Sequence, residues 1–110
     1  MELLDSFAVA IGTELILDVV SLYTNRRFQA FARLPMQWGL NGTPNWYAPR
    51  WLAISFMPWL AGLILGGIAL SLGAARIGFV EICLLGPVFI AAHLLHVWLI
   101  GRTLRQPARR

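Results

Sequence analysis

Two long apolar segments fill most of the second half of the chain. Residues Trp51–Gly73 carry no charged side chain, and residues Ile77–Gly101 carry one, Glu81, near their start. An α-helix needs about 20 predominantly apolar residues to cross a hydrocarbon core of about 30 Å, and both segments exceed that length. The pattern therefore predicts two membrane-spanning helices, which any fold of this chain must accommodate.

The composition favours the same interpretation. Hydrophobic residues make up 58% of the 110 positions and charged residues only 13%, whereas a typical soluble domain has about 25% charged residues. A soluble domain this small would leave much of its apolar surface in water. The net charge of +4 comes wholly from arginine, since the sequence has no lysine, and the single cysteine, Cys83, permits no internal disulfide. Lipid is the solvent that suits this chain.

A third helix is predicted over Leu3–Tyr23, although this segment contains Asp5, Glu14 and Asp18. An acid costs about 2.5–3.5 kcal/mol at the centre of a membrane helix, while each large apolar residue contributes about 0.3–0.6 kcal/mol to insertion. Insertion is therefore marginal unless the helix packs against the others. A helix lying in the interface is the alternative, but such helices usually have a basic polar face. We expect an all-α integral membrane protein, one domain over residues 1–110, with transmembrane helices at about 3–23, 51–73 and 77–101.

The arginines predict the orientation of these helices. With three crossings, eight arginines flank one side of the membrane and a single arginine, Arg76, flanks the other. The eight are Arg26, Arg27, Arg33, Arg50, Arg102, Arg105, Arg109 and Arg110. Because cytoplasmic flanks of membrane helices are enriched in arginine and lysine, we expect the first loop and the C-terminus in the cytoplasm and the N-terminus outside.

The loop before the second helix has an unusual composition. Residues Leu34–Trp51 contain three prolines, two glycines and three tryptophans. Asn41 and Gly42 both tolerate positive φ and so indicate a turn, and tryptophan and tyrosine suit the headgroup region. The pattern predicts an ordered hairpin lying on the membrane face. Its other interpretation is a recognition loop, in which the amides of Gln37, Asn41 and Asn45 bind a ligand.

Residues 33–60 resemble domain of unknown function 1648, the membrane module of SdpI-type bacterial immunity proteins. The matching positions are Leu34, Pro35, Gln37, Trp38, Asn41, Gly42, Pro44, Asn45, Tyr47, Arg50 and Pro58. The resemblance implies a protein of the bacterial inner membrane with a non-enzymatic role. Gln37 replaces a common histidine of that pattern and Asn45 a usual aspartate, so neither residue matches a titrating or metal-binding position. The family's loop lies outside the cell, whereas the arginine bias of eight to one predicts the cytoplasm, and we follow the arginines.

Four titratable side chains form a candidate site within the membrane. Glu14 and Asp18 are four positions apart on the first helix, and His93 and His96 are three apart on the third, so each pair shares a helical face. If Leu22 and Ile100 end these parallel helices at one level, Asp18 lies at the depth of His96 and Glu14 at that of His93. Three interpretations are a hydrogen-bonded polar cluster, a metal or proton-relay site, and side chains that reach the headgroups.

The sequence lacks the patterns of an enzyme: a serine–histidine–aspartate set, a glycine-rich phosphate loop and a Cys-x-x-Cys motif. We therefore expect no catalytic residues, no cofactor, no bound metal and no nucleic-acid partner. The expected partners are membrane lipids and a membrane protein or second copy, the latter meeting the small-residue face of Gly62 and Gly66. The predicted role is that of a sensing, immunity-like or accessory subunit. The alternative is an intramembrane metal-binding or redox protein that uses the acid and histidine cluster.

Overall fold

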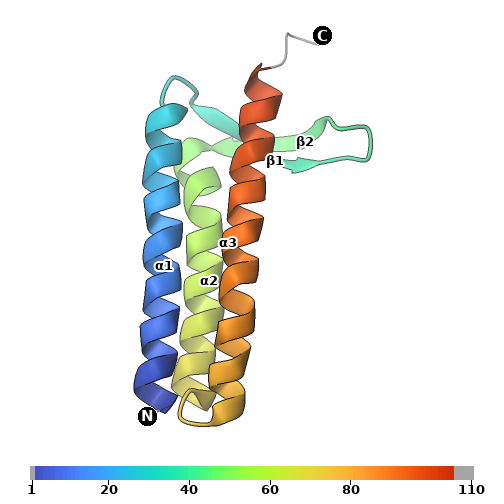
Figure 1. Ribbon diagram of the computed structural model, residues 1–110. Coiled ribbons are helices and arrows are strands. Elements are labelled where there is room, and N and C mark those ends of the chain that lie inside the picture. The colour runs from blue at the N-terminus through green and yellow to red at the C-terminus, as the bar shows by residue number, and fades with distance from the viewer. Residues whose placement is uncertain (1, 106–110) are drawn as a thin grey trace.

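A computed structural model describes residues 2–105 and shows three long helices with one β-hairpin between the first two (Figure 1). The elements in chain order are α1 (Glu2–Arg27), β1 (Arg33–Trp38), β2 (Pro44–Pro49), α2 (Arg50–Leu72) and α3 (Arg76–Arg105). The three predicted helices are present, but the expectation of an all-α chain missed the two-stranded sheet. Both strands of such a sheet are edge strands, where proline is tolerated because some backbone N–H groups have no ladder partner. The prolines that suggested a loop therefore lie within strands.

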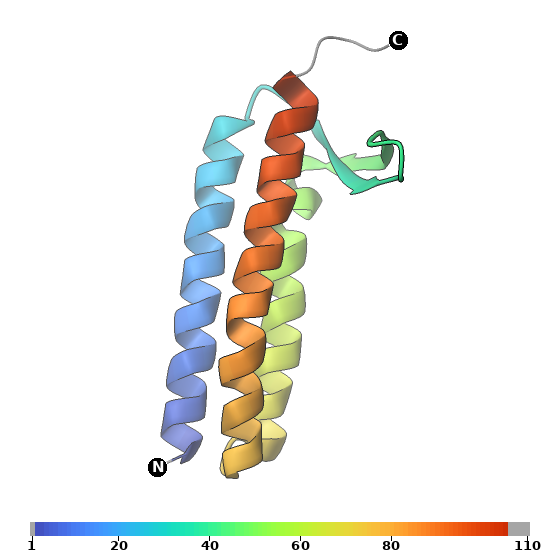
Figure 2. The same cartoon turned by 45° about the vertical axis from the view of Figure 1, so that its right-hand side comes forward.

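The helices pack side by side in an up-down-up bundle, with α1 and α3 parallel and α2 antiparallel to both (Figures 1 and 2). Small residues line the contacts: Ala10, Ala61 and Ala69 are buried in the core around Leu17 and Leu65. The backbones of α1 and α3 come close where a Cβ on Gly86 would lie 2.8 Å from the Thr13 hydroxyl oxygen. Small residues at such contacts are typical of helices that associate within a membrane.

Helices α2 and α3 are each long and apolar enough to cross a membrane. Less than a third of either apolar segment is buried inside the bundle, so most of it faces outward. The exposed large apolar residues are spread over all three helices and include Ile11, Leu15, Val19, Leu22, Phe56, Leu63, Leu70, Leu84, Val88 and Leu95. Soluble monomers rarely expose contiguous apolar surface on this scale. The outer surface of the bundle is therefore suited to contact with lipid.

The hairpin extends sideways from one end of the bundle, beside the end of α3 (Figures 1 and 2). Its strands are antiparallel, with a register irregularity after Pro35. Gly42 has a φ of 83°, which confirms the expected left-handed turn position. The side-chain oxygen of Asn41 accepts hydrogen bonds from the Thr43 backbone N–H (3.1 Å) and hydroxyl (2.7 Å). This local pairing holds the tip in one conformation.

Candidate functional site

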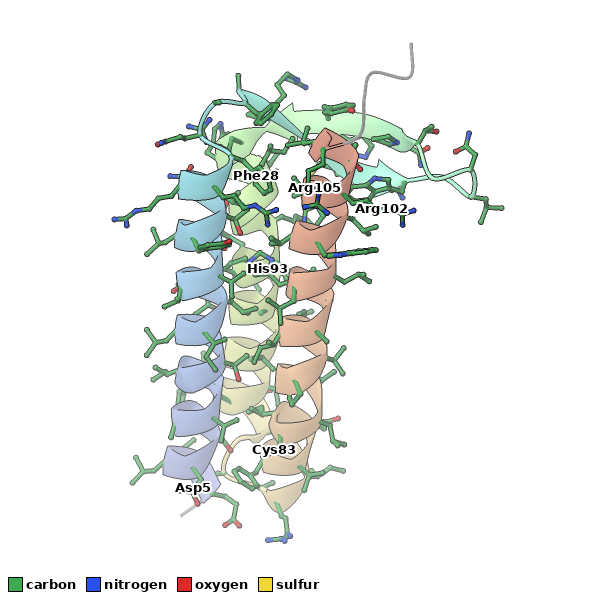
Figure 3. All side chains as sticks on the ribbon, turned by 45° about the horizontal axis from the view of Figure 1, so that its top comes forward. Asp5, Phe28, Cys83, His93, Arg102 and Arg105 are labelled. Atoms are coloured by element: carbon green, nitrogen blue, oxygen red, sulfur yellow. The ribbon has the colours of Figure 1, made fainter. Side chains whose placement is uncertain are left out.

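One buried hydrogen-bonded chain joins all three helices. The Ser21 hydroxyl of α1 lies 2.6 Å from the Ile54 carbonyl oxygen of α2 and 2.9 Å from Nε2 of His93 on α3. His93 is almost fully buried, and Figure 3 shows its ring among the helices. Polar side chains inside a membrane bundle usually pair with one another or with the backbone. We call this set of three groups the three-helix junction.

Pro58 explains why the Ile54 carbonyl is available to Ser21. In an α-helix the carbonyl of residue i accepts from the N–H of residue i+4, so Ile54 would normally bond to residue 58. Proline has no N–H, and the carbonyl four positions earlier is left without its helical partner. The Ser21 hydroxyl supplies the missing donor. The proline and the serine therefore form one structural unit, although they lie 37 positions apart in the sequence.

The donor roles in the junction follow from counting protons. A serine hydroxyl has one proton, and in this geometry it is directed to Ile54 at the shorter distance. Nε2 of His93 must then donate to the Ser21 oxygen, which makes the neutral imidazole the Nε2–H tautomer. Nδ1 is left as a buried acceptor without a hydrogen-bond partner among the described residues. His93 thus acts through one nitrogen as a link between α3 and α1.

The structure does not bring the predicted acids to the histidines. Thr13 lies beside Gly86 and Ser21 beside His93, so Glu14 is about 10 Å below His93 along the bundle. The predicted pairing was wrong because it placed Leu22 level with Ile100, whereas Ser21 lies beside His93, so α1 and α3 are shifted by about six positions from that assumption. Within residues 2–105 no group of three or more His, Cys, Asp or Glu side chains is arranged to hold a metal.

The two acids instead lie along the α1 face nearest to α2. A Cβ on Gly62 would be 3.5 Å from a carboxylate oxygen of Glu14, so Gly62 leaves room for that carboxylate. This oxygen, Oε1, is buried and has no hydrogen-bond partner among the described side chains, whereas Asp18 is exposed. Gly66 has open space in front of it. The predicted small-residue face is therefore used within the chain at Gly62 and is free at Gly66.

His96 belongs to a different contact, the one that attaches the hairpin to α3. Its Nε2 lies 3.4 Å from the Pro35 carbonyl oxygen, and its ring packs edge-on against Trp38. The indole N–H of Trp38 donates to the Thr103 hydroxyl at 2.9 Å. Leu34 and Ala48 are buried next to Ile100 and complete the contact. The hairpin is thus fixed on the bundle by two polar contacts and an apolar cluster.

Arg50 orders the connection between α1 and the hairpin. Its guanidinium donates to the side-chain oxygen of Asn25 (2.9 Å) and to the backbone carbonyls of Gln29 (3.0 Å) and Phe31 (2.7 Å). Its backbone N–H also donates to the Ala32 carbonyl. From the sequence, Arg50 was treated as a positive charge and as a position of the family resemblance, and this role was missed.

Several hairpin side chains remain outside these contacts. Gln37, Asn45, Trp46, Tyr47 and Leu40 are all exposed, and Leu40 lies at the tip with no burial at all. By contrast, the other loop residues singled out from the sequence have structural positions: Pro35 and Pro58 are buried, Pro44 starts β2, and Trp38, Asn41, Gly42 and Arg50 make the contacts described above. These exposed side chains take no part in the contacts that attach the hairpin to the bundle.

Charge is distributed unevenly between the two ends of the bundle. Six described arginines lie at the hairpin end. They are Arg26, Arg27, Arg33, Arg50, Arg102 and Arg105. None of the five acidic residues of the chain lies in the hairpin, the last two turns of α1 or the last turn of α3. At the opposite end Arg76 faces Glu2 at 3.7 Å. Among the described residues, the hairpin end therefore presents positive charge that no acidic side chain balances.

Comparison of the chain with family models, curated proteins and solved structures finds no match.

Proposed function

We propose that this chain is a small inner-membrane protein of bacteria with three transmembrane helices, acting as a sensing, immunity-like or accessory subunit rather than as an enzyme. Its α1 helix enters the membrane together with α2 and α3. Gly62 leaves room for the Glu14 carboxylate, and hydrogen bonds to Ile54 and His93 offset the polar cost of Ser21. The exposed apolar residues of α1 continue the lipid-facing surface of the other two helices.

The observation that carries this proposal is the exposed residue set on a firmly attached hairpin. Trp38, Pro35 and Arg50 fix the hairpin to the bundle, while Gln37, Asn45, Trp46 and Tyr47 remain available for contact. Aromatic residues flanked by amides are well suited to binding a protein surface, because the rings supply area and the amides supply specific hydrogen bonds. The resemblance of residues 33–60 to domain of unknown function 1648 supports the same assignment.

The charge distribution supports a cytoplasmic position for the hairpin. Its six nearby arginines fit the positive side of a membrane protein, and Arg76 at the other end lies beside Glu2. We therefore propose that the N-terminus lies outside the cell and the C-terminus inside.

Site-specific photocrosslinking in living cells tests the interaction. A photoreactive residue at Asn45 or Tyr47 should give discrete protein adducts, whereas one at Tyr23, an exposed residue of α1, should give lipid adducts alone. Adding Gln37→Ala should abolish the protein adducts without changing the melting temperature, since the Gln37 side chain is exposed. If the hairpin positions yield only lipid adducts like those from Tyr23, the proposed interaction role is wrong.

A further inference from the structure

Two cavities adjoin beneath the hairpin. The first, of about 370 Å³, lies between the hairpin tip and the end of α3. The second, of about 250 Å³, lies between β1, α2 and α3. Trp38 and Leu99 line both cavities, so the two are neighbours with these side chains between them. We call the two cavities together the cleft, and each cavity one half of it.

The two halves of the cleft differ in chemistry. The first half is lined by Arg102, Thr103, Asn41 and Thr43 and offers the guanidinium of Arg102, the hydroxyl of Thr103 and the amide N–H groups of Asn41, whereas the Thr43 hydroxyl donates to Asn41. No ion pair of Arg102 is present within residues 2–105, and its guanidinium lies 5.5 Å from the ring centre of Trp98. Arginine beside hydroxyl donors is a favourable environment for a phosphate group.

The second half is almost wholly apolar. Its walls include Met36, Phe56, Met57, Ala92 and Leu95, with His96 as the one titratable side chain. Ala92 lies ten residues before Arg102 on α3, so the cleft extends about 15 Å along the helix axis. That length is about half of a 30 Å hydrocarbon core, which is the depth of one leaflet.

We propose that this cleft binds an anionic phospholipid of the surrounding leaflet, with its phosphate on Arg102 and one acyl chain in the apolar half. Charge complementarity selects the headgroup, because the hairpin end has an excess of arginine and, within residues 2–105, no carboxylate pairs with Arg102. Figure 3 shows Arg102 on the hairpin side of α3. The proposal rests on the membrane insertion described under the proposed function, but it needs neither the protein partner nor the cytoplasmic orientation.

Native mass spectrometry of the purified full chain, released from detergent after titration with defined lipids, tests the assignment. Phosphatidylglycerol should bind more tightly than phosphatidylcholine with the same acyl chains. Arg102→Gln should weaken phosphatidylglycerol binding about tenfold, since hydrogen bonds to charged groups are among the stronger ones in proteins. Arg26→Gln is the matched control, because it removes the same charge at the same end from an exposed residue of α1. That variant should bind within about twofold of the unmodified chain.

The acyl half has its own matched pair. Ala92→Trp fills the apolar cavity and should abolish the preferred binding, whereas Ala91→Trp, at the exposed neighbouring position, should leave it unchanged. Equal losses for Arg102→Gln and Arg26→Gln would show general charge attraction and overturn the proposal. Competition by glycerol phosphate as strong as by the intact lipid would overturn it in favour of a free-anion site. Incorporation of the protein into nanodiscs, measured separately, distinguishes failure of this site from failure of membrane insertion.

Discussion

The junction between Ser21, Ile54 and His93 leads to a quantitative prediction, because Pro58 creates the acceptor that Ser21 satisfies. Ser21→Ala removes a 2.6 Å bond to the Ile54 carbonyl and a 2.9 Å bond to His93. Two buried polar groups then lose a partner. An unsatisfied buried group costs about 1–3 kcal/mol in soluble proteins, but side-chain hydrogen bonds within membranes average only about 0.6 kcal/mol. We therefore expect Ser21→Ala to lower the free energy of unfolding by about 1–2 kcal/mol.

A double-mutant cycle with Pro58→Ala isolates the proposed cause. Alanine at position 58 restores a backbone N–H, which can bond to the Ile54 carbonyl along the helix. In the Pro58→Ala background, Ser21→Ala should then cost less by about 0.5–1 kcal/mol, because the carbonyl keeps a partner. The measurement is unfolding of the purified protein by a denaturing detergent in mixed micelles.

The matched control is Ser71→Ala on α2. The Ser71 hydroxyl bonds to the Gly67 carbonyl one turn earlier in its own helix and is exposed, so its loss should change the free energy of unfolding very little. If Ser21→Ala is no more destabilising than Ser71→Ala, the junction does not stabilise the bundle. If its cost is the same with and without Pro58, the link between the proline and the serine is refuted.

Three further substitutions test the hairpin. Gly42→Val places a β-branched residue at a φ of 83°, which should strain the turn by about 1–3 kcal/mol. Protease cleavage within residues 34–50 should increase while the helices stay inserted. Unchanged protection of these residues would contradict the turn assignment. Arg50→Gln removes the bonds to Gln29 and Phe31, so residues 28–32 should become more sensitive to proteolysis. The free energy of unfolding should fall by only about 1–2 kcal/mol, because these bonds are solvent-exposed. Trp38→Phe should lower the melting temperature, because it removes the hydrogen bond to Thr103, worth about 1 kcal/mol. Trp46→Phe, at an exposed position, should not lower it. Equal effects of the two substitutions would argue against attachment of the hairpin to α3 through Trp38.

The number and placement of the helices could be predicted because length and apolarity are local properties of the sequence. The boundaries of α2 and α3 at their shared turn differ from expectation by a single residue. The left-handed turn at Gly42 was also predictable, since Asn-Gly is a local signal. An ordered hairpin was expected here and is present, but its strands were not assigned because Pro35, Pro44 and Pro49 lie in them, and only the antiparallel pairing shows that each is an edge position.

The site was harder to predict because it depends on the relative depth of two helices. The ends of α1 and α3 are not level as assumed, so Ser21, not Glu14, lies beside His93. Nothing local to Ser21 indicates that a proline on another helix has freed a carbonyl for it. The two histidines also have separate roles that their spacing could not distinguish: His93 bonds within the bundle, and His96 contacts the hairpin. Residue types predicted that the two histidines would make polar contacts, but not their partners, and they did not predict the role of Ser21.

Cysteine labelling at the two ends of the bundle tests the proposed orientation and the crossing of the membrane by α2 most directly. With Cys83 changed to alanine, Thr43→Cys at the hairpin tip and Ala74→Cys between α2 and α3 place one thiol at each end. In intact cells a membrane-impermeant thiol reagent should label Ala74→Cys and not Thr43→Cys, and permeabilisation should make both reactive. Labelling of Thr43→Cys alone in intact cells would reverse the orientation. Equal labelling of both thiols in intact cells would contradict the crossing of the membrane by α2.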